Sequence, residues 1–208
     1  RDRVILASKT KAAANANRVE IMRALEGSLG RLKTDYLDVY FNHAVNDVAR
    51  IQNEEWWEFT QLAKQQGKIR YCGMSGHGSQ LGRCLDYALE HDLVDVILVA
   101  YNFGQDPDFL NRLKQSLHFS NLQPDLPRML FKAKQKNVGV IAMKTLMGAR
   151  RNDIRLYERD GNTFAQAAFR WVLSNPYVDG LVVSMTSKED IDEYVGGSSA
   201  SKLADYEI

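Results

Sequence analysis

The sequence predicts an α/β fold built from successive βαβ units. Six short apolar runs typical of buried strands alternate with segments whose apolar residues recur every three or four positions, as on one face of a helix. Successive strands begin roughly 30 to 40 residues apart, which leaves room for one crossover helix between neighbours. Such units connect parallel strands, so the carboxyl ends of all six strands are expected at one edge of the sheet.

Each predicted strand ends in small or polar residues. The strands are expected at residues 3–8, 34–43, 69–74, 94–101, 138–143 and 178–185. The first contains the continuous apolar run Val4–Ala7, which indicates a strand buried on both faces. The second alternates apolar and polar residues and stops at His43. Lys9 and His43 are therefore expected where two neighbouring strands end.

The predicted helices lie between these strands. They are expected at residues 19–32, 54–66, 81–91, 128–135, 164–173 and 191–195. Residues 102–127 carry several Asp-Pro, Pro-Asp and Leu-Pro pairs, which indicate a long substrate loop or lid with one helical piece at 109–117. Residues 196–199 (Gly-Gly-Ser-Ser) indicate a flexible joint.

The composition is that of an ordinary globular protein. The 208 residues are 45% hydrophobic and 25% charged with a net charge of +1, which gives no sign of a nucleic-acid partner or of disorder. No run approaches the roughly 18 to 20 apolar residues of a membrane helix, so we expect no membrane partner and, by default, a cytoplasmic location. The first residue, Arg1, is not Met, and we expect natural sequence before it. Cys72 and Cys84 have no CxxC spacing and are expected to be reduced core thiols.

Several motifs at the predicted strand ends occur in the order typical of one family. They are residues 5–9 (Ile-Leu-Ala-Ser-Lys), 25–32, 34–43, 67–75, 101–102, 139–142 and 168–173. In this ordered set the sequence resembles the aldo-keto reductases, in particular a branch known as predicted oxidoreductases. Some members of that branch carry a cysteine-rich iron–sulfur segment after the barrel, and a similar tail is expected if the natural protein continues past Ile208.

The resemblance implies a (β/α)8 TIM barrel domain over residues 1–208, with this chain supplying strands three to eight. It also implies NADPH or NADH as cofactor, bound without a GxGxxG loop, and catalysis by Asp, Tyr, Lys and His. Lys9 and His43 match the last two, and the Asp and Tyr are expected upstream of Arg1. Because six strands alone leave open edges, the chain by itself is not expected to be a competent reductase.

The resemblance assigns cofactor contacts to residues that follow three of the predicted strands. They are Ser75, Gly76, Met143, Lys144, Leu146, Gly148, Ser184, Thr186 and Ser187. Gly76 stands where the family usually has Asn, Leu98 where it has Gln, and Met143 where an aromatic ring stacks on the nicotinamide. Asp190 replaces an arginine that pairs with the 2′-phosphate of NADP, which predicts weak selectivity for that phosphate.

We therefore expect NAD(P)H-dependent reduction of a small aldehyde or ketone, with no metal ion. The alternative is a nucleotide-binding sensor or regulatory barrel with little turnover, which the loss of the Asn, the Gln and the aromatic favours. The sequence does not favour a hydrolase, because it has no HxH cluster, no GxSxG motif and no paired glutamates at strand ends. His77 is equally compatible with a substrate contact and with a solvated loop.

Overall fold

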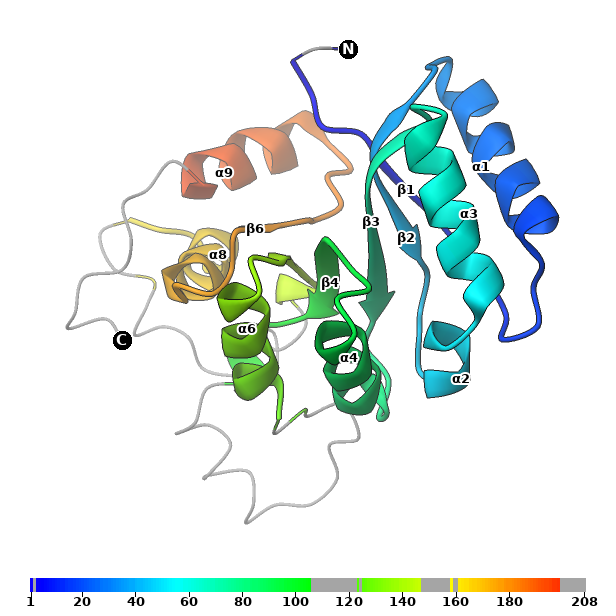
Figure 1. The fold of residues 1–208 in the computed structure, drawn as a ribbon. Helices are drawn as coiled ribbons and strands as arrows, with labels where there is room; N and C mark the ends of the chain where they lie inside the picture. Colours follow the sequence, from blue (N-terminus) through cyan, green and yellow to red (C-terminus); the bar gives the residue numbers. More distant parts are fainter. Residues whose placement is uncertain (2, 106–122, 124, 147–157, 159–160, 199–208) are drawn as a thin grey trace. The chain divides into compact units, whose positions relative to one another are not determined.

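The computed structural model describes residues 1, 3–105, 123, 125–146, 158 and 161–198. Its strands are β1 (Ala7–Thr10), β2 (Leu37–Asn42), β3 (Ile69–Gly76), β4 (Val96–Ala100), β5 (Gly139–Met143) and β6 (Gly180–Leu181). Its helices are α1 (Arg18–Leu32), α2 (Val48–Ile51), α3 (Glu54–Gln65), α4 (Leu81–Glu90), α6 (Leu126–Gln135), α8 (Phe164–Ser174) and α9 (Lys188–Ser198), with a 3-10 turn η1 at Phe103–Gln105. The strands are hydrogen-bonded in sequence order, β1 to β6, and Figure 1 labels β1, β2 and β3 side by side in the first part of the chain.

The chain divides into two compact units. The first comprises Arg1–Leu98 and Asp125–Gly139, and the second Val99–Pro124 and Val140–Ile208. The boundary falls within β4 and at the start of β5. Each unit is described by itself below.

In the first unit, β1, β2 and β3 pair in parallel and in a fixed register. Lys9 pairs with Phe41, and Phe41 pairs with Gly73. An added Cβ on Gly73 would lie 2.2 Å from the carbonyl oxygen of Val96 and 2.8 Å from the Phe41 ring. Only glycine lets these backbones and the ring approach so closely, so Gly73 is needed for this packing.

The core of this unit lies between the strands and the helices α1 and α3, which run side by side (Figure 1). Tyr40 from β2 stacks on Trp56 at 6.3 Å between ring centres and meets Phe59 edge-on at 5.9 Å. All three are at most 1% exposed, and Leu25 of α1 and Ile69 of β3 complete the cluster. Burying such large apolar side chains is the main favourable term in forming this layer.

Three aspartates tie the amino end of one strand segment to the next. In each case the carboxylate accepts a hydrogen bond from a backbone N–H of the preceding segment. The pairs are Asp38 with Leu6, Asp95 with Cys72, and Asp179 with Val140, all at 2.8 Å. Because these charged hydrogen bonds recur at alternate strand pairs, they help to hold the parallel register at the amino edge.

The second unit is built around α8, which packs on α9, on β6 and on η1. Thr163 caps α8 through a hydrogen bond to the Gln166 amide, as the sequence predicts. Phe169 meets Tyr194 of α9 edge-on at 5.1 Å, and Trp171 stacks on Tyr101 at 5.3 Å. The tryptophan therefore serves packing.

The predicted helices and the middle strands are confirmed, but the first strand is wrong in part. Val4 and Ile5 are 56% and 81% exposed, and β1 starts only at Ala7 with alternating exposure. Every residue of β1 is exposed or half-buried, so β1 is not buried on both faces. Among the described residues β1 pairs with β2 alone and stands at the end of the strand order.

Three other expectations differ from the structure at the ends of elements. The last strand is only Gly180–Leu181, shorter than the expected 178–185, although the Val182 N–H still donates to the Ala142 carbonyl at 2.8 Å. The helix α9 continues to Ser198, so the flexible joint expected at residues 196–199 is wrong for residues 196–198. The short helix α2 is not among the predicted helices, and the piece at 109–117 lies outside the described residues. A single domain over 1–208 stays a prediction.

We predict that Asp95 stabilises the first unit in a pH-dependent way. Burial raises the pKa of this carboxyl, but hydrogen bonds from Lys64 and from the Cys72 amide oppose it, and the net pKa lies below the ordinary 3.8. A lowered pKa means stability that is present above the ordinary pKa and is lost as the pH falls through the folded value. Because the side chain is 36% exposed, Asp95→Asn should cost only about 1 kcal/mol at neutral pH.

Urea unfolding at neutral pH and near pH 3 measures this cost. The difference between wild type and Asp95→Asn should be smaller at the lower pH, because the carboxylate begins to be protonated there. Asp86→Asn is the matched control, since Asp86 is 35% exposed and pairs with Lys132 without accepting a strand N–H. An equal cost for both variants at neutral pH would contradict the role of the strand hydrogen bond.

Candidate functional site

The predicted site residues fall into two groups. Lys9, His43, Ser75 and Gly76 belong to the first unit, at the carboxyl ends of β1, β2 and β3. The other described members follow β5 and β6 in the second unit: Met143, Lys144, Leu146, Ser184, Thr186 and Ser187. Gly148 and most of the 102–127 loop lie outside the described residues.

His43 directly follows β2, and its backbone continues the pairing with β1. Its N–H donates to the carbonyl of Thr10 at 2.8 Å. Lys9 pairs with Phe41, and side chains alternate along a strand, so Lys9, Phe41 and His43 belong to the same face. Both Lys9 and His43 are exposed. The strand register thus brings the two predicted catalytic residues together.

The surroundings of His43 favour the neutral imidazole. Its pKa is lowered from the ordinary 6.5, first by partial burial and then by the positive charges of Lys9, Arg50, His77 and Lys11. A neutral ring offers one N–H donor and one acceptor nitrogen. At neutral pH His43 can therefore donate a hydrogen bond to a ligand oxygen while cations surround that position.

The turn after His43 has an unusual backbone. Ala44 has a φ of 54°, in the left-handed region that residues with a Cβ rarely adopt. Its N–H donates to the Ser75 hydroxyl at 3.2 Å, and its carbonyl accepts from Arg50 at 2.8 Å. The next residue, Val45, donates its N–H to the Ser75 carbonyl at 2.8 Å. The turn is thus fixed to the end of β3.

Ser75 and Gly76 have structural roles in this packing. Ser75 is 1% exposed and its hydroxyl serves Ala44, so a contact with a nicotinamide stays a prediction. A Cβ on Gly76 would lie 2.7 Å from the Val45 carbonyl oxygen and equally close to Leu81. The backbone approach of Val45 explains why glycine stands here instead of the family's asparagine.

In the second unit, Lys144 and Thr145 follow β5. Lys144 has a φ of 58°, and its carbonyl accepts a hydrogen bond from Asn102 at 3.2 Å. The buried hydroxyl of Thr145 has no hydrogen-bond partner among the described residues. Sequence reasoning missed Thr145, although it lies inside the motif that supplied Lys144 and Leu146. A cation beside an available hydroxyl is a donor set that suits a phosphate oxygen.

The hydrogen-bond donors of Thr186 and Ser187, just before α9, already bond the side chain of Asp190 in that helix. The carboxylate of Asp190 accepts hydrogen bonds from the Thr186 amide at 2.7 Å, the Thr186 hydroxyl at 2.8 Å and the Ser187 amide at 3.2 Å. These bonds, that of the Thr186 amide first, lower the pKa of Asp190. Thr186 and Ser187 therefore offer fewer free donors to a nucleotide than the sequence suggests, and Ser184 is exposed in the loop before them.

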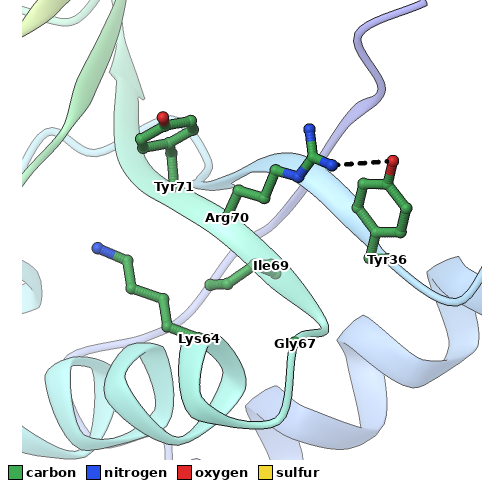
Figure 2. A pocket seen from close by; sticks show the side chains of 6 residues that line it. All are labelled: Tyr36, Lys64, Gly67, Ile69, Arg70 and Tyr71. Carbon is green, nitrogen blue, oxygen red and sulfur yellow. Dashed lines mark hydrogen bonds between the residues drawn. The ribbon is translucent and has the colours of Figure 1, made fainter. Parts of the chain in front are cut away.

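A separate hollow of about 460 Å³ lies at the amino end of β3, away from His43 (Figure 2). Its two cations are engaged: Lys64 pairs with Asp95 at 2.7 Å, and Arg70 pairs with Asp38 at 3.0 Å. Figure 2 shows the hydrogen bond from Arg70 to the Tyr36 hydroxyl. These contacts hold the amino edge together and leave no cation there without a partner.

Other site chemistry finds no support in the part of the chain that the structure describes. No three His, Cys, Asp or Glu residues there are grouped to hold a metal ion. Cys72 and Cys84 are buried free thiols, as expected, and burial raises the pKa of each to about 11. None of the described helices is long and apolar enough to cross a membrane.

We predict that Gly76 tolerates no side chain. Gly76→Ala should lower the free energy of unfolding by about 1 to 3 kcal/mol, because the Val45 carbonyl must move to admit a Cβ. In the control Gly30→Ala, no atom lies within 4 Å of the new Cβ, and a helical alanine should add up to about 1 kcal/mol. Urea unfolding compares the two, and equal stability of Gly76→Ala and wild type would contradict the prediction.

Comparison with known proteins finds one family. The model of the aldo/keto reductase family matches residues 1–156. Aldo-keto reductase YhdN of Bacillus subtilis (strain 168) is 40% identical over 82 residues, which are 36% of this chain and 24% of that protein. The uncharacterized oxidoreductase YrpG of the same organism is 23% identical over 205 residues, covering 85% of this chain and 58% of that protein. The chain thus spans less than two thirds of the length of either relative.

Solved structures show the same fold. A thermostable aldo-keto reductase, Tm1743, crystallised with the inhibitor epalrestat, matches with a TM-score of 0.74 at 23% identity over 100% of this chain and 70% of that one. The holo form of aldo-keto reductase AKR11C1 from Bacillus halodurans matches with a TM-score of 0.72 at 19% identity over 99% and 70%. The predicted fold class is confirmed: the six strands are part of a (β/α)8 TIM barrel.

Proposed function

The chain belongs to the aldo/keto reductase family, and on that premise we propose that its protein reduces a small aldehyde or ketone by hydride transfer from NADPH or NADH. The observation that supports this most is the placement of Lys9 and His43 on the same face, at the carboxyl ends of the neighbouring strands β1 and β2. In a TIM barrel that is the edge where catalytic residues lie. The lowered pKa of His43 fits a group that donates a hydrogen bond in its neutral form.

The two residues would act on the carbonyl oxygen. The neutral imidazole of His43 would orient the substrate by donating its N–H to that oxygen. The ammonium of Lys9 would favour the negative charge that develops there during hydride transfer, and it would lower the pKa of a neighbouring proton donor. The Tyr and Asp that the family uses with this pair stay predictions.

The bound nicotinamide would supply the hydride. In the second unit Lys144 and the buried Thr145 hydroxyl suit a phosphate oxygen of the dinucleotide. The Thr186–Asp190 turn fits less well, because Asp190 already occupies its donors. The contacts of Met143, Leu146, Ser184 and the other predicted residues with the cofactor belong to this proposal.

We predict that His43→Ala and Lys9→Met each lower kcat/KM for aldehydes by about 10²- to 10⁴-fold, since each removes a group that acts on the reacting oxygen. The whole protein is assayed with NADPH and NADH on a panel of aldehydes, and cofactor binding is followed by quenching of tryptophan fluorescence. His91→Ala is the control, because His91 lies at the end of α4, where its ring contacts Tyr87 of that helix. Tight cofactor binding without turnover, unchanged in both variants, would favour the sensor instead.

We predict that wild type prefers NADPH over NADH by less than about a hundredfold. Asp190→Asn should raise the affinity for NADPH relative to NADH by about tenfold, because it removes a negative charge and weakens the hydrogen bonds that occupy the Thr186 and Ser187 donors. Titration of both cofactors measures the ratio. Asp192→Asn, which removes an equal charge from the same helix, is the control and should leave the ratio unchanged.

A further inference from the structure

We propose that Arg50 is a positioning residue for His43, holding the turn that carries His43 against the loop after β1. The inference rests on the proposed function, because it assigns a further residue to the same site. Arg50 lies in α2 and is 9% exposed. No sequence pattern singled it out, since α2 is only four residues long.

One guanidinium group joins two loops. It donates to the Ala12 carbonyl at 2.6 Å in the loop after β1. On the other side it donates to the Asn42 side-chain oxygen at 2.6 Å, to the His43 carbonyl at 3.0 Å and to the Ala44 carbonyl at 2.8 Å. The planar fork of arginine can satisfy several acceptors at fixed angles, which a lysine ammonium cannot do from one nitrogen.

These contacts restrain the residues on either side of the imidazole. Asn42 precedes His43, and Ala44, with its left-handed backbone, follows it. A non-glycine residue in that region is strained and persists only where its surroundings hold it. Arg50 holds Ala44 through its carbonyl, while Ser75 holds it through its N–H. Because the backbone on both sides of His43 is held, the Cα–Cβ bond of His43 has one fixed direction.

Arg50 also adds to the positive field at His43. All four of its acceptors are neutral oxygens, and Asp47 is the acidic group that raises the pKa of Arg50 against the effect of burial. The charged and titratable groups that lower the pKa of His43 come from β1, from the loop after it, from α2 and from the segment after β3. They are Lys9, Lys11, Arg50 and His77.

A purely structural tie is the competing explanation, and Asn53 provides the matched control. Asn53 is also 9% exposed, and its side chain donates to Ala13 at 3.1 Å and to Ala16 at 2.9 Å. It therefore anchors the same loop after β1 without touching His43 or Ala44. Asn53→Ala should lower stability but leave His43 unchanged.

The test uses Arg50→Met, Arg50→Lys and Asn53→Ala in the whole protein. The imidazole of His43 is titrated by NMR, kcat is measured on an aldehyde, and thermal unfolding is recorded for each variant. Arg50→Met should raise the pKa of His43, because one of the surrounding cations is lost, and should lower kcat by about 10- to 100-fold. Arg50→Lys keeps the charge, so it should keep the pKa of His43 but still lose kcat, since the fork is gone.

Two results would overturn the proposal. One is a folded Arg50→Met with the pKa of His43 and kcat of wild type; the other is Asn53→Ala reproducing both changes at an equal loss of Tm. If Arg50→Met does not fold, Arg50→Lys decides: wild-type kcat refutes the positioning role. If wild type itself turns over no aldehyde, the proposed function fails, while the NMR signals of His43 in the Arg50 variants still decide whether Arg50 positions it.

Discussion

The parallel register of β1, β2 and β3 is the constraint on which the rest of the first unit depends. It sets Lys9 beside Phe41 and Phe41 beside Gly73. Because Gly73 has no side chain, the Phe41 ring and the Val96 carbonyl can approach its backbone closely. A slip of one residue would send every side chain to the opposite face. The placement of Lys9 and His43 on the same face would then be lost together with the Tyr40 cluster, so core and site are fixed by the same hydrogen bonds.

The two edges of this part of the sheet differ in whether their positive charges are paired with carboxylates. At the amino edge Lys64 and Arg70 each pair with a buried or half-buried carboxylate, and Asp38 and Asp95 also accept strand N–H groups. At the carboxyl edge, partial burial and then several positive charges lower the pKa of one imidazole. The amino edge therefore serves stability, whereas the carboxyl edge carries a positive field at His43, on the side where a barrel places its chemistry.

Much of the fold could be predicted because long amphipathic helices and apolar strands carry strong periodic signals. The helix α1 and the strand ending before His43 are examples. The errors fall where the outcome depends on neighbours. Val4 and Ile5 have the composition of a buried strand, but whether they are buried depends on what lies across from them. A helix as short as α2 has too few residues for a period, so Arg50 gave no signal.

The sequence by itself determined the family, the approximate carboxyl ends of β1 and β2 and the identity of Lys9 and His43 as the residues placed there, because these depend on local order along the chain. Tertiary structure alone decided that Arg50 and Ser75 hold the turn of His43, that Gly76 makes room for the Val45 carbonyl, and that Asp190 occupies the donors before α9. The reason is physical: hydrogen bonds and close approaches join atoms whose separation in space is unrelated to their separation in sequence.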